Sequence, residues 1–203
     1  MNTILNIARK STVTALVAMS LAGCSALGGG GADLDTYDIS APGDLSSISG
    51  STGAQLLVPT PTSLKLLNSD RIVVRAAGNE VTYLPGIRLP DSLPNVLQLK
   101  LAETFVNTGR FGGVGLPGQG LLIDYQLITV VRAFEIRPSG GGFVARAEIS
   151  AKLVNDRNGV VRAARVFVSE VLAASSGQAA AQALDSAFDT VAADITNWIV
   201  GTI

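Results

Sequence analysis

The sequence predicts an α+β fold, a two-layer sandwich in which two amphipathic helices pack on one face of a mainly antiparallel sheet. Residues 122–137, 143–154 and 160–172 have strand patterns and are joined by short turns, which predicts the sheet. Residues 93–105 and 184–199 repeat apolar side chains at three- and four-residue spacing, which predicts the helices. The chain contains no internal repeat, so we expect a single core.

The amino terminus has the three parts of an export signal, residues 1–23. A basic pair is followed by an apolar run of about ten residues, which is too short for a transmembrane helix. The run ends in Leu21-Ala22-Gly23-Cys24. Because this tetrapeptide resembles the bacterial lipobox, we expect Leu21, Ala22 and Gly23 to form the processing motif and Cys24 to carry the lipid.

Cys24 is the only cysteine of the chain, so no intramolecular disulfide can form. A small buried residue in a helical leader is the alternative interpretation. Several acyl chains would hold the protein firmly to a membrane, because each buried methylene contributes about 0.8 kcal/mol. Residues 24–34 include a run of four glycines and form the predicted flexible, lipidated tether. Residues 35–203 form the predicted single periplasmic domain.

The composition excludes some partners and favours others. The formal net charge is −1, and no cluster of lysine and arginine is present, so we expect no nucleic-acid binding. Charged residues make up 15% of the chain, compared with about 25% in typical soluble proteins, while apolar residues make up 47%. We therefore expect a partner or lipid to cover part of the apolar surface.

The first half of the domain contains short segments separated by Ser, Gly, Thr and Pro. Its predicted elements are a strand at residues 36–39, an irregular connection at 40–63, a short segment at 64–67, and a hairpin of 71–75 with 80–84 across Gly78-Asn79. Pro94 suits the first turn of the first helix and Gly109 suits its end. In the second half, residues 155–159 form a predicted hairpin loop.

Gly113, Gly115 and Gly118 match the dinucleotide-binding pattern GxGxxG. That motif requires a strand before it and a helix after it, so that backbone amides point at the pyrophosphate. Here a predicted helix precedes the motif and a predicted strand follows it, and Pro117 has no amide hydrogen. We therefore predict an ordinary glycine-rich loop and no cofactor.

The sequence also argues against catalysis. It contains no histidine, which removes the usual general base and the commonest metal ligand. The acidic residues lie in predicted turns, at a helix start or on polar faces, where solvation or capping explains them. We therefore expect no enzyme, no catalytic residue and no metal site. Trp198 and Phe111 are ambiguous, since each could fill the core or contact a partner.

The chain resembles the family of ABC-type transport auxiliary lipoproteins. The likeness extends through nearly all of the predicted mature chain, and it depends on the order and spacing of short stretches rather than on any single motif. These stretches are residues 37–39, 69–75, 81–86, 93–98, 124–127, 132–136, 152–155 and 164–167, followed by the helix that contains Trp198.

The resemblance implies an auxiliary subunit of an Mce/Mla-type transport system for phospholipid or another hydrophobic cargo. Its implied partners are an ABC permease, its ATPase and an Mce-domain protein, and a homo-oligomer is left open. The implied place is the cell envelope, facing the periplasm, and Ser25 after the lipidated cysteine favours the outer membrane. Two alternatives remain, a periplasmic carrier that binds lipid or sterol, and a purely structural envelope lipoprotein.

Overall fold

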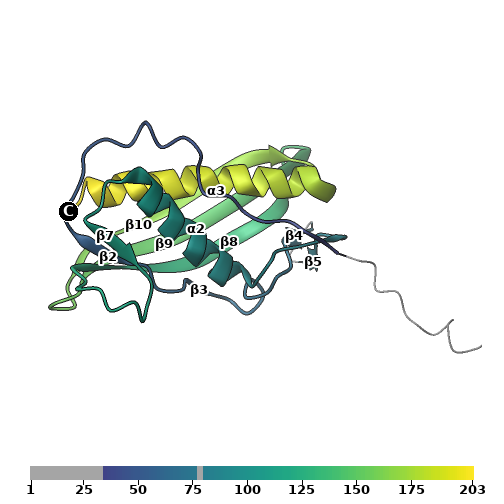
Figure 1. Cartoon of the computed structure of the whole chain (residues 1–203). Coiled ribbons are helices and arrows are strands. Elements are labelled where there is room, and N and C mark those ends of the chain that lie inside the picture. Colours follow the sequence, from purple (N-terminus) through teal and green to yellow (C-terminus); the bar gives the residue numbers. More distant parts are fainter. Residues whose placement is uncertain (1–33, 77–79) are drawn as a thin grey trace, which may run out of the picture. The chain divides into compact units, whose positions relative to one another are not determined.

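The three long strands predicted for the second half of the chain lie side by side and form the largest part of the sheet, with the third of them at its edge (Figure 1). The computed structural model describes residues 34–76 and 80–203. Strands β8 (Tyr125–Ser139), β9 (Gly142–Asn155) and β10 (Val161–Ala173) pair antiparallel in chain order. Their predicted bounds are close to the observed ones, except that β8 begins three residues later than expected, at Tyr125.

The inner face of β9 is apolar, as its alternating sequence predicts. A β-bulge at Arg132 in β8 shifts the alternation by one residue, so that Val131 lies opposite Ile149 before it and Phe134 opposite Ala147 after it. The face toward the helices therefore stays apolar along both strands. Its buried members on β9 are Ala145, Ala147, Ile149, Ala151 and Leu153.

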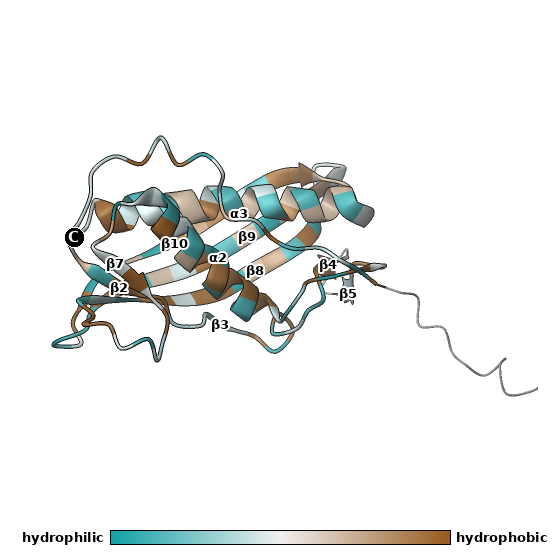
Figure 2. Ribbon diagram, in the orientation of Figure 1, coloured by the Kyte–Doolittle hydropathy of each residue, from teal (hydrophilic) through white to brown (hydrophobic). Residues whose placement is uncertain are grey.

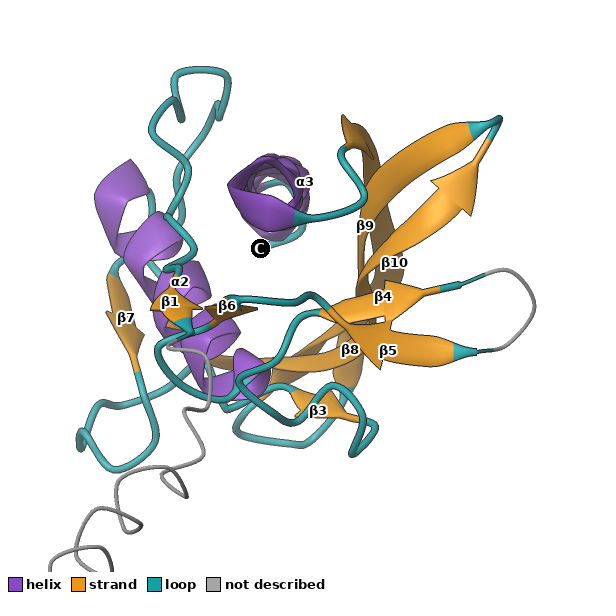
Figure 3. Ribbon diagram, turned by 90° about the vertical axis from the view of Figure 1, so that its right-hand side faces the viewer, coloured by secondary structure: helices purple, strands orange, loops and turns teal. Residues whose placement is uncertain are grey.

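Helices α2 (Leu93–Thr108) and α3 (Gly177–Val200) lie on the same side of the sheet, as Figure 3 shows. Pro94 lies in the first turn of α2, and Gly109 ends the helix with a φ of 62°, a left-handed conformation that suits glycine. Hydrophobic and hydrophilic residues alternate along α3 and the long strands (Figure 2). The predicted two-layer α+β sandwich is therefore confirmed.

The first half of the domain adds seven short strands. These are β1 (Asp35–Thr36), β2 (Gln55–Leu57), β3 (Thr62–Ser63), β4 (Val73–Arg75), β5 (Val81–Tyr83), β6 (Ile87–Arg88) and β7 (Gly113–Gly115). The predicted hairpin is present as the antiparallel pair β4–β5, although its turn at Gly78-Asn79 lies outside the described residues.

Several predictions for this half were wrong. The strand expected at residues 36–39 is only β1, which starts one residue earlier. The connection expected to be irregular contains β2 and β3, and residues 64–67 form a turn in which the Leu67 amide donates to the Leu64 carbonyl. These short strands pair with partners distant in sequence, so local pattern does not reveal them.

The sheet is consequently mixed. Strands β2, β3 and β4 each pair parallel with β8, and β2 also pairs parallel with β7, whereas all long-strand pairs are antiparallel. The two-stranded pair β1–β6 is separate from the large sheet. The core between sheet and helices is filled by aromatic and aliphatic side chains, among which Phe105, Phe134 and Phe188 are the largest fully buried ones.

Candidate functional site

The predicted lipidation site and its motif, Leu21-Ala22-Gly23-Cys24, and nearly all of the tether lie outside the described residues. The described chain starts at Leu34, immediately before β1. We call the contact of residues 35–40 with the first half of α3 the N-terminal seam. It is the part of the domain that lies next to the predicted tether.

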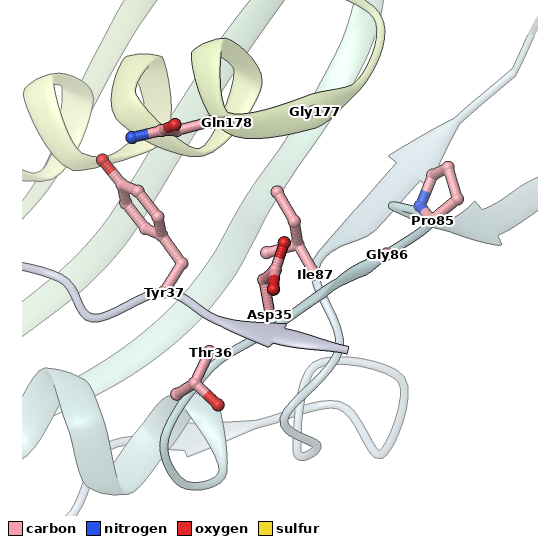
Figure 4. A pocket seen from close by; sticks show the side chains of 8 residues that line it. All are labelled: Asp35, Thr36, Tyr37, Pro85, Gly86, Ile87, Gly177 and Gln178. Carbon is pink, nitrogen blue, oxygen red and sulfur yellow. The ribbon is translucent and has the colours of Figure 1, made fainter. Parts of the chain in front are cut away.

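Strand β1 places side chains into a depression at the seam. Its volume is about 380 Å³, and it is lined by Asp35, Thr36, Tyr37, Pro85, Gly86, Ile87, Gly177 and Gln178. The amide of Asp35 donates to the Gly86 carbonyl at 2.9 Å, and that of Tyr37 donates to the Arg88 carbonyl at 2.8 Å. In Figure 4 the Tyr37 side chain extends from the end of β1 toward α3. These bonds attach the start of the domain to β6.

Two carboxylates one helical turn apart give the seam its electrostatic character. Asp185 accepts hydrogen bonds from the Ser40 amide (2.7 Å) and from the Ser40 hydroxyl (2.9 Å to Oδ2). Burial, and then the negative charge of Asp185, raises the pKa of Asp189 from 3.8 to about 6. Burial together with the charge of Asp185 also raises the pKa of Tyr37. The folded domain therefore disfavours the ionised form of the Asp189 carboxyl.

Replacing Asp189 by asparagine is expected to stabilise the domain at neutral pH. A raised folded-state pKa means that the folded chain binds the proton more tightly, so this contribution is complete below about pH 4 and is lost as the pH rises through about 6. Asparagine resembles the protonated form. We expect a gain of about 1 kcal/mol in the free energy of unfolding at pH 7.5, after allowance for solvent screening.

Urea unfolding of both proteins between pH 4 and 8 checks this result. The gain should shrink to nothing at the acidic end of the range. Asp194→Asn on the same helix is the matched control, because Asp194 is exposed. An equal effect of both substitutions, or one independent of pH, would contradict the assignment to Asp189.

The sheet face opposite the helices carries a network of arginines and glutamates. Glu135 has a side chain only 5% exposed and accepts from Arg75 Nε at 2.9 Å and Nη2 at 2.7 Å. Glu148 pairs with Arg132 at 3.1 Å and with Arg146. The remaining member, Glu170 on β10, accepts from Arg137 at 2.9 Å and from Arg146. Four arginines and three glutamates of this face are thus joined in ion pairs.

Apolar side chains are exposed around this network and at the ends of the domain. On the outer sheet face Ile128, Val130, Val166 and Val168 are each 39–44% exposed. Further exposed apolar residues are Leu64 in the turn at 64–67, Leu99 and Val106 on α2, Leu121 and Leu122 before β8, Val160 just before β10, Val161 at its start and Leu172 near its end.

The first part of the glycine motif is a strand, whereas the sequence predicted an ordinary glycine-rich loop. Gly113 and Gly115 lie in β7, with α2 before them and β8 after them, which is the order that the sequence predicted. The preceding Gly112 is required for close packing, because a Cβ there would lie 2.1 Å from the carbonyl oxygen of Gly53. The glycines therefore allow β7 and residues 53–55 to approach each other.

Both ambiguous aromatic residues pack against the core. The ring of Trp198 lies 5.5 Å from that of Phe167, at an interplanar angle of 63°. Phe111 lies 5.5 Å from Phe105, which is fully buried. Both residues are partly buried, so the core interpretation accounts for most of their surface.

Sequence reasoning missed the roles of Asp189 and Glu135. The spacing of Asp185 and Asp189 was a usable signal, since like charges four residues apart on a helix repel each other. No local pattern marks Glu135. Within residues 34–76 and 80–203, no helix is long and apolar enough to cross a membrane. Over the same residues, no three histidine, cysteine or acidic side chains are grouped to hold a metal.

Comparisons with known proteins agree with this fold. A family model described as the ABC-type transport auxiliary lipoprotein component matches residues 37–196. The uncharacterized protein bll6063 of Bradyrhizobium diazoefficiens is 32% identical over 185 residues, which is 89% of this chain. The match covers 49% of that protein, so the chain spans about half the length of this curated relative.

Two solved structures have similar folds. Protein XCC0632 from Xanthomonas campestris, of the family DUF330, superposes with a TM-score of 0.73 at 25% identity, covering 83% of this chain and 96% of that chain. The hypothetical protein CT253 from Chlamydia trachomatis superposes with a TM-score of 0.51 at 7% identity, covering 76% and 98%. The second likeness shows the fold alone.

Proposed function

Because the chain belongs to the family of ABC-type transport auxiliary lipoproteins, we propose that it is a non-enzymatic subunit of an Mce/Mla-type transporter. The family match over residues 37–196 is the observation that carries this proposal. The lipoprotein character of the family puts the protein in the cell envelope. Its proposed partners are an Mce-domain protein, an ABC permease and the ATPase, and the proposed cargo is phospholipid or another hydrophobic molecule.

The proposed task is to dock the periplasmic assembly at the outer membrane. In this proposal Cys24 carries the lipid, and residues 24–34 join it to β1. About ten residues reach at most ~35 Å when fully extended, so the domain works within that distance of the membrane. The exposed apolar residues of the outer sheet face, α2 and the loop before β8 support docking, because contact with a partner would remove them from water.

Affinity purification of the full-length protein from detergent-solubilised membranes tests the proposal. We expect an Mce-domain protein and the permease to co-purify, and we expect deletion of the gene to disturb the lipid composition of the envelope. Recovery of no transporter component would refute the docking function. Native mass spectrometry distinguishes the alternative of a lipid carrier, since a docking subunit should arrive without bound lipid.

Replacing Cys24 by serine is expected to abolish lipidation and leave the domain folded, because residue 24 precedes every described element. The protein should lose the mass of its acyl chains and either leave the membrane fraction or accumulate with its signal peptide attached. Membrane fractionation with intact-mass measurement checks this. The neighbouring Ser25→Ala is the control and should remain lipidated. A soluble Cys24→Ser form that supports full transport would contradict docking at the membrane.

A further inference from the structure

A strap without regular structure lies across helix α3. It consists of residues 37–42, which follow β1 and belong to no strand or helix. In Figure 1 this segment runs from β1 across α3, in the direction of the carboxyl end of the helix. Its buried residues are Ile39, which is 2% exposed, and Pro42. Because no backbone ladder holds the strap, its position depends on side-chain contacts, which are typical of a segment with low local stability.

The polar contacts between the strap and α3 advance along the helix. Tyr37 is hydrogen-bonded to the side chain of Gln182. Three residues later along the strap, the amide and the hydroxyl of Ser40 both donate to Asp185. The strap and the helix therefore advance in the same direction, and the residues after Ser40 approach the next turn of α3, which carries Asp189.

The folded domain solvates the carboxyl group of Asp189 poorly. Its Oδ1 atom is buried and has no hydrogen-bond partner among the residues that the structure describes. A buried carboxylate without a donor costs free energy, whereas the protonated form carries no charge. Burial and then the charge of Asp185 accordingly raise the pKa of Asp189 to about 6. Removal of the cover from Asp189 would therefore favour its ionised form.

The neighbouring charges do not compensate for this burial. Asp185 is negative and opposes the ionisation of Asp189. Lys100 of α2 contacts the strap, but its ammonium group pairs with Asp38 at 3.1 Å and with Glu103 at 3.6 Å. The lysine is thus committed to two other carboxylates. The remaining titratable side chains that face α3 from the strap and the long strands are Tyr37, Tyr125 on β8, and Arg165 on β10, which stacks on Phe167 beside Trp198.

We propose that the strap is a proton-sensitive latch, which stays closed on α3 while the Asp189 carboxyl is protonated and opens more often once that carboxyl is ionised. Opening returns water to the ionised group and separates Ser40 from Asp185. The closed form binds the proton more tightly than the open form, because its pKa is the raised one. Its extra stability is therefore complete below about pH 4 and is lost as the pH rises through about 6.

Opening of the latch would uncover apolar surface. Ile39 and Pro42 are buried in the closed form, so their departure exposes the side chains of the helices that they contact. The pH would then control the access of a hydrophobic partner or cargo to this surface. That use of the latch rests on the proposed function, whereas the opening itself depends only on the domain.

Titration of Asp189 by NMR tests the latch in the full-length protein, labelled with ¹³C-aspartate and held in detergent micelles. Its carboxyl signal, identified by its loss in Asp189→Asn, should titrate near pH 6. Ile39→Ala weakens the packing of the strap, because Ile39 is only 2% exposed. Proton binding and closure are linked reciprocally, so this substitution should lower the pKa of Asp189 toward its ordinary value of 3.8.

Ile48→Ala is the matched control for Ile39→Ala. Ile48 lies in the same connection before β2, is 1% exposed and loses the same atoms, but it lies beyond the strap. Its substitution should therefore leave the pKa of Asp189 near 6.

Amide hydrogen exchange measures the opening directly and does not require Ile39→Ala to fold. The Ser40 amide donates to Asp185, so it exchanges when the strap opens. After correction for the intrinsic exchange rate, its protection should fall roughly fivefold between pH 5 and pH 8, with allowance for solvent screening. Asp189→Asn should remove this dependence, whereas Asp194→Asn, at an exposed position of the same helix, should retain it.

Four results would overturn the proposal. They are an Asp189 carboxyl that titrates near pH 4 in the unsubstituted protein, an unchanged pKa in Ile39→Ala, equal effects of Ile39→Ala and Ile48→Ala, and a protection of the Ser40 amide that does not vary with pH. None of these measurements involves a transporter component, so the failure of the latch is distinguishable from the failure of the proposed function.

Discussion

Alanine at position 112 is expected to destabilise the domain by about 3 kcal/mol, the largest effect of a single methyl group that the structure predicts. The new Cβ would lie 2.1 Å from the carbonyl oxygen of Gly53 and 2.7 Å from its carbonyl carbon. Both are backbone atoms, so no side-chain rotation relieves the clash. The chain must instead separate β7 from β2, which loses parallel pairing at the edge of the sheet.

Thermal unfolding measures this effect, which should lower the Tm by about 6–12 °C in a domain of this size. Gly53→Ala is the matched control because it adds a methyl group to the other partner of the same contact, where a Cβ meets nothing within 4 Å. That substitution should be neutral or slightly stabilising. Equal Tm values for Gly112→Ala and the unsubstituted protein would contradict the close approach of the two segments.

Replacing Arg75 by methionine is expected to cost about 2–3 kcal/mol. The substitution keeps a long side chain but removes the guanidinium that binds both oxygens of Glu135. Because the Glu135 side chain is only 5% exposed, its carboxylate would remain in the protein without a counter-ion. Removing one partner of a buried ion pair is costly for this reason.

Arg137→Met provides a matched comparison on the same sheet face. Arg75 and Arg137 are 36% and 37% exposed, but the glutamate that pairs with Arg137 is 33% exposed rather than 5%. Exposed ion pairs contribute about 1 kcal/mol or less, so we expect a much smaller effect. Urea unfolding of both variants decides the matter, and losses of similar size would show that burial of Glu135 is not the cause.

The elements that the sequence predicts well are those whose own residues repeat. Residues 145–152 alternate apolar and polar side chains through four pairs, and α2 has a helical pattern with Pro94 and Gly109 at its ends. In both cases the spacing of the buried apolar residues matches the period of the element, which is why the sequence predicts it. The bulge at Arg132 is different, because it arises from the register between β8 and β9 and leaves no local pattern.

The short parallel strands could not be predicted. Strands β2 and β3 contain three and two residues, too few for any period, and both depend on pairing with β8 about 65–70 positions later. The polar residues of residues 40–63 suggest a loop, and only the edge of β8 makes part of that segment extended. The long strands make the sheet mainly antiparallel, as expected, and these short strands make it mixed.

The candidate site also contains one residue that local sequence predicts and others that depend on distant parts of the chain. Cys24 is predicted from its immediate neighbours, because a processing enzyme reads a short motif. Asp189 and Glu135 are ordinary acidic residues in the sequence, and only the tertiary packing of the domain partly buries the first and almost fully buries the second. The position of β10 at the edge of the sheet likewise depends on the order of all the strands.

The order of strands along the chain has a consequence for folding. Strands β8, β9 and β10 are consecutive, and helix α3 follows directly, so this half contains mostly local contacts that form quickly. Strands β2, β3 and β4 are made first on the ribosome, but each needs β8 as its partner. The first half of the domain must therefore wait for the second half, and the strands made first are the last to acquire their partners.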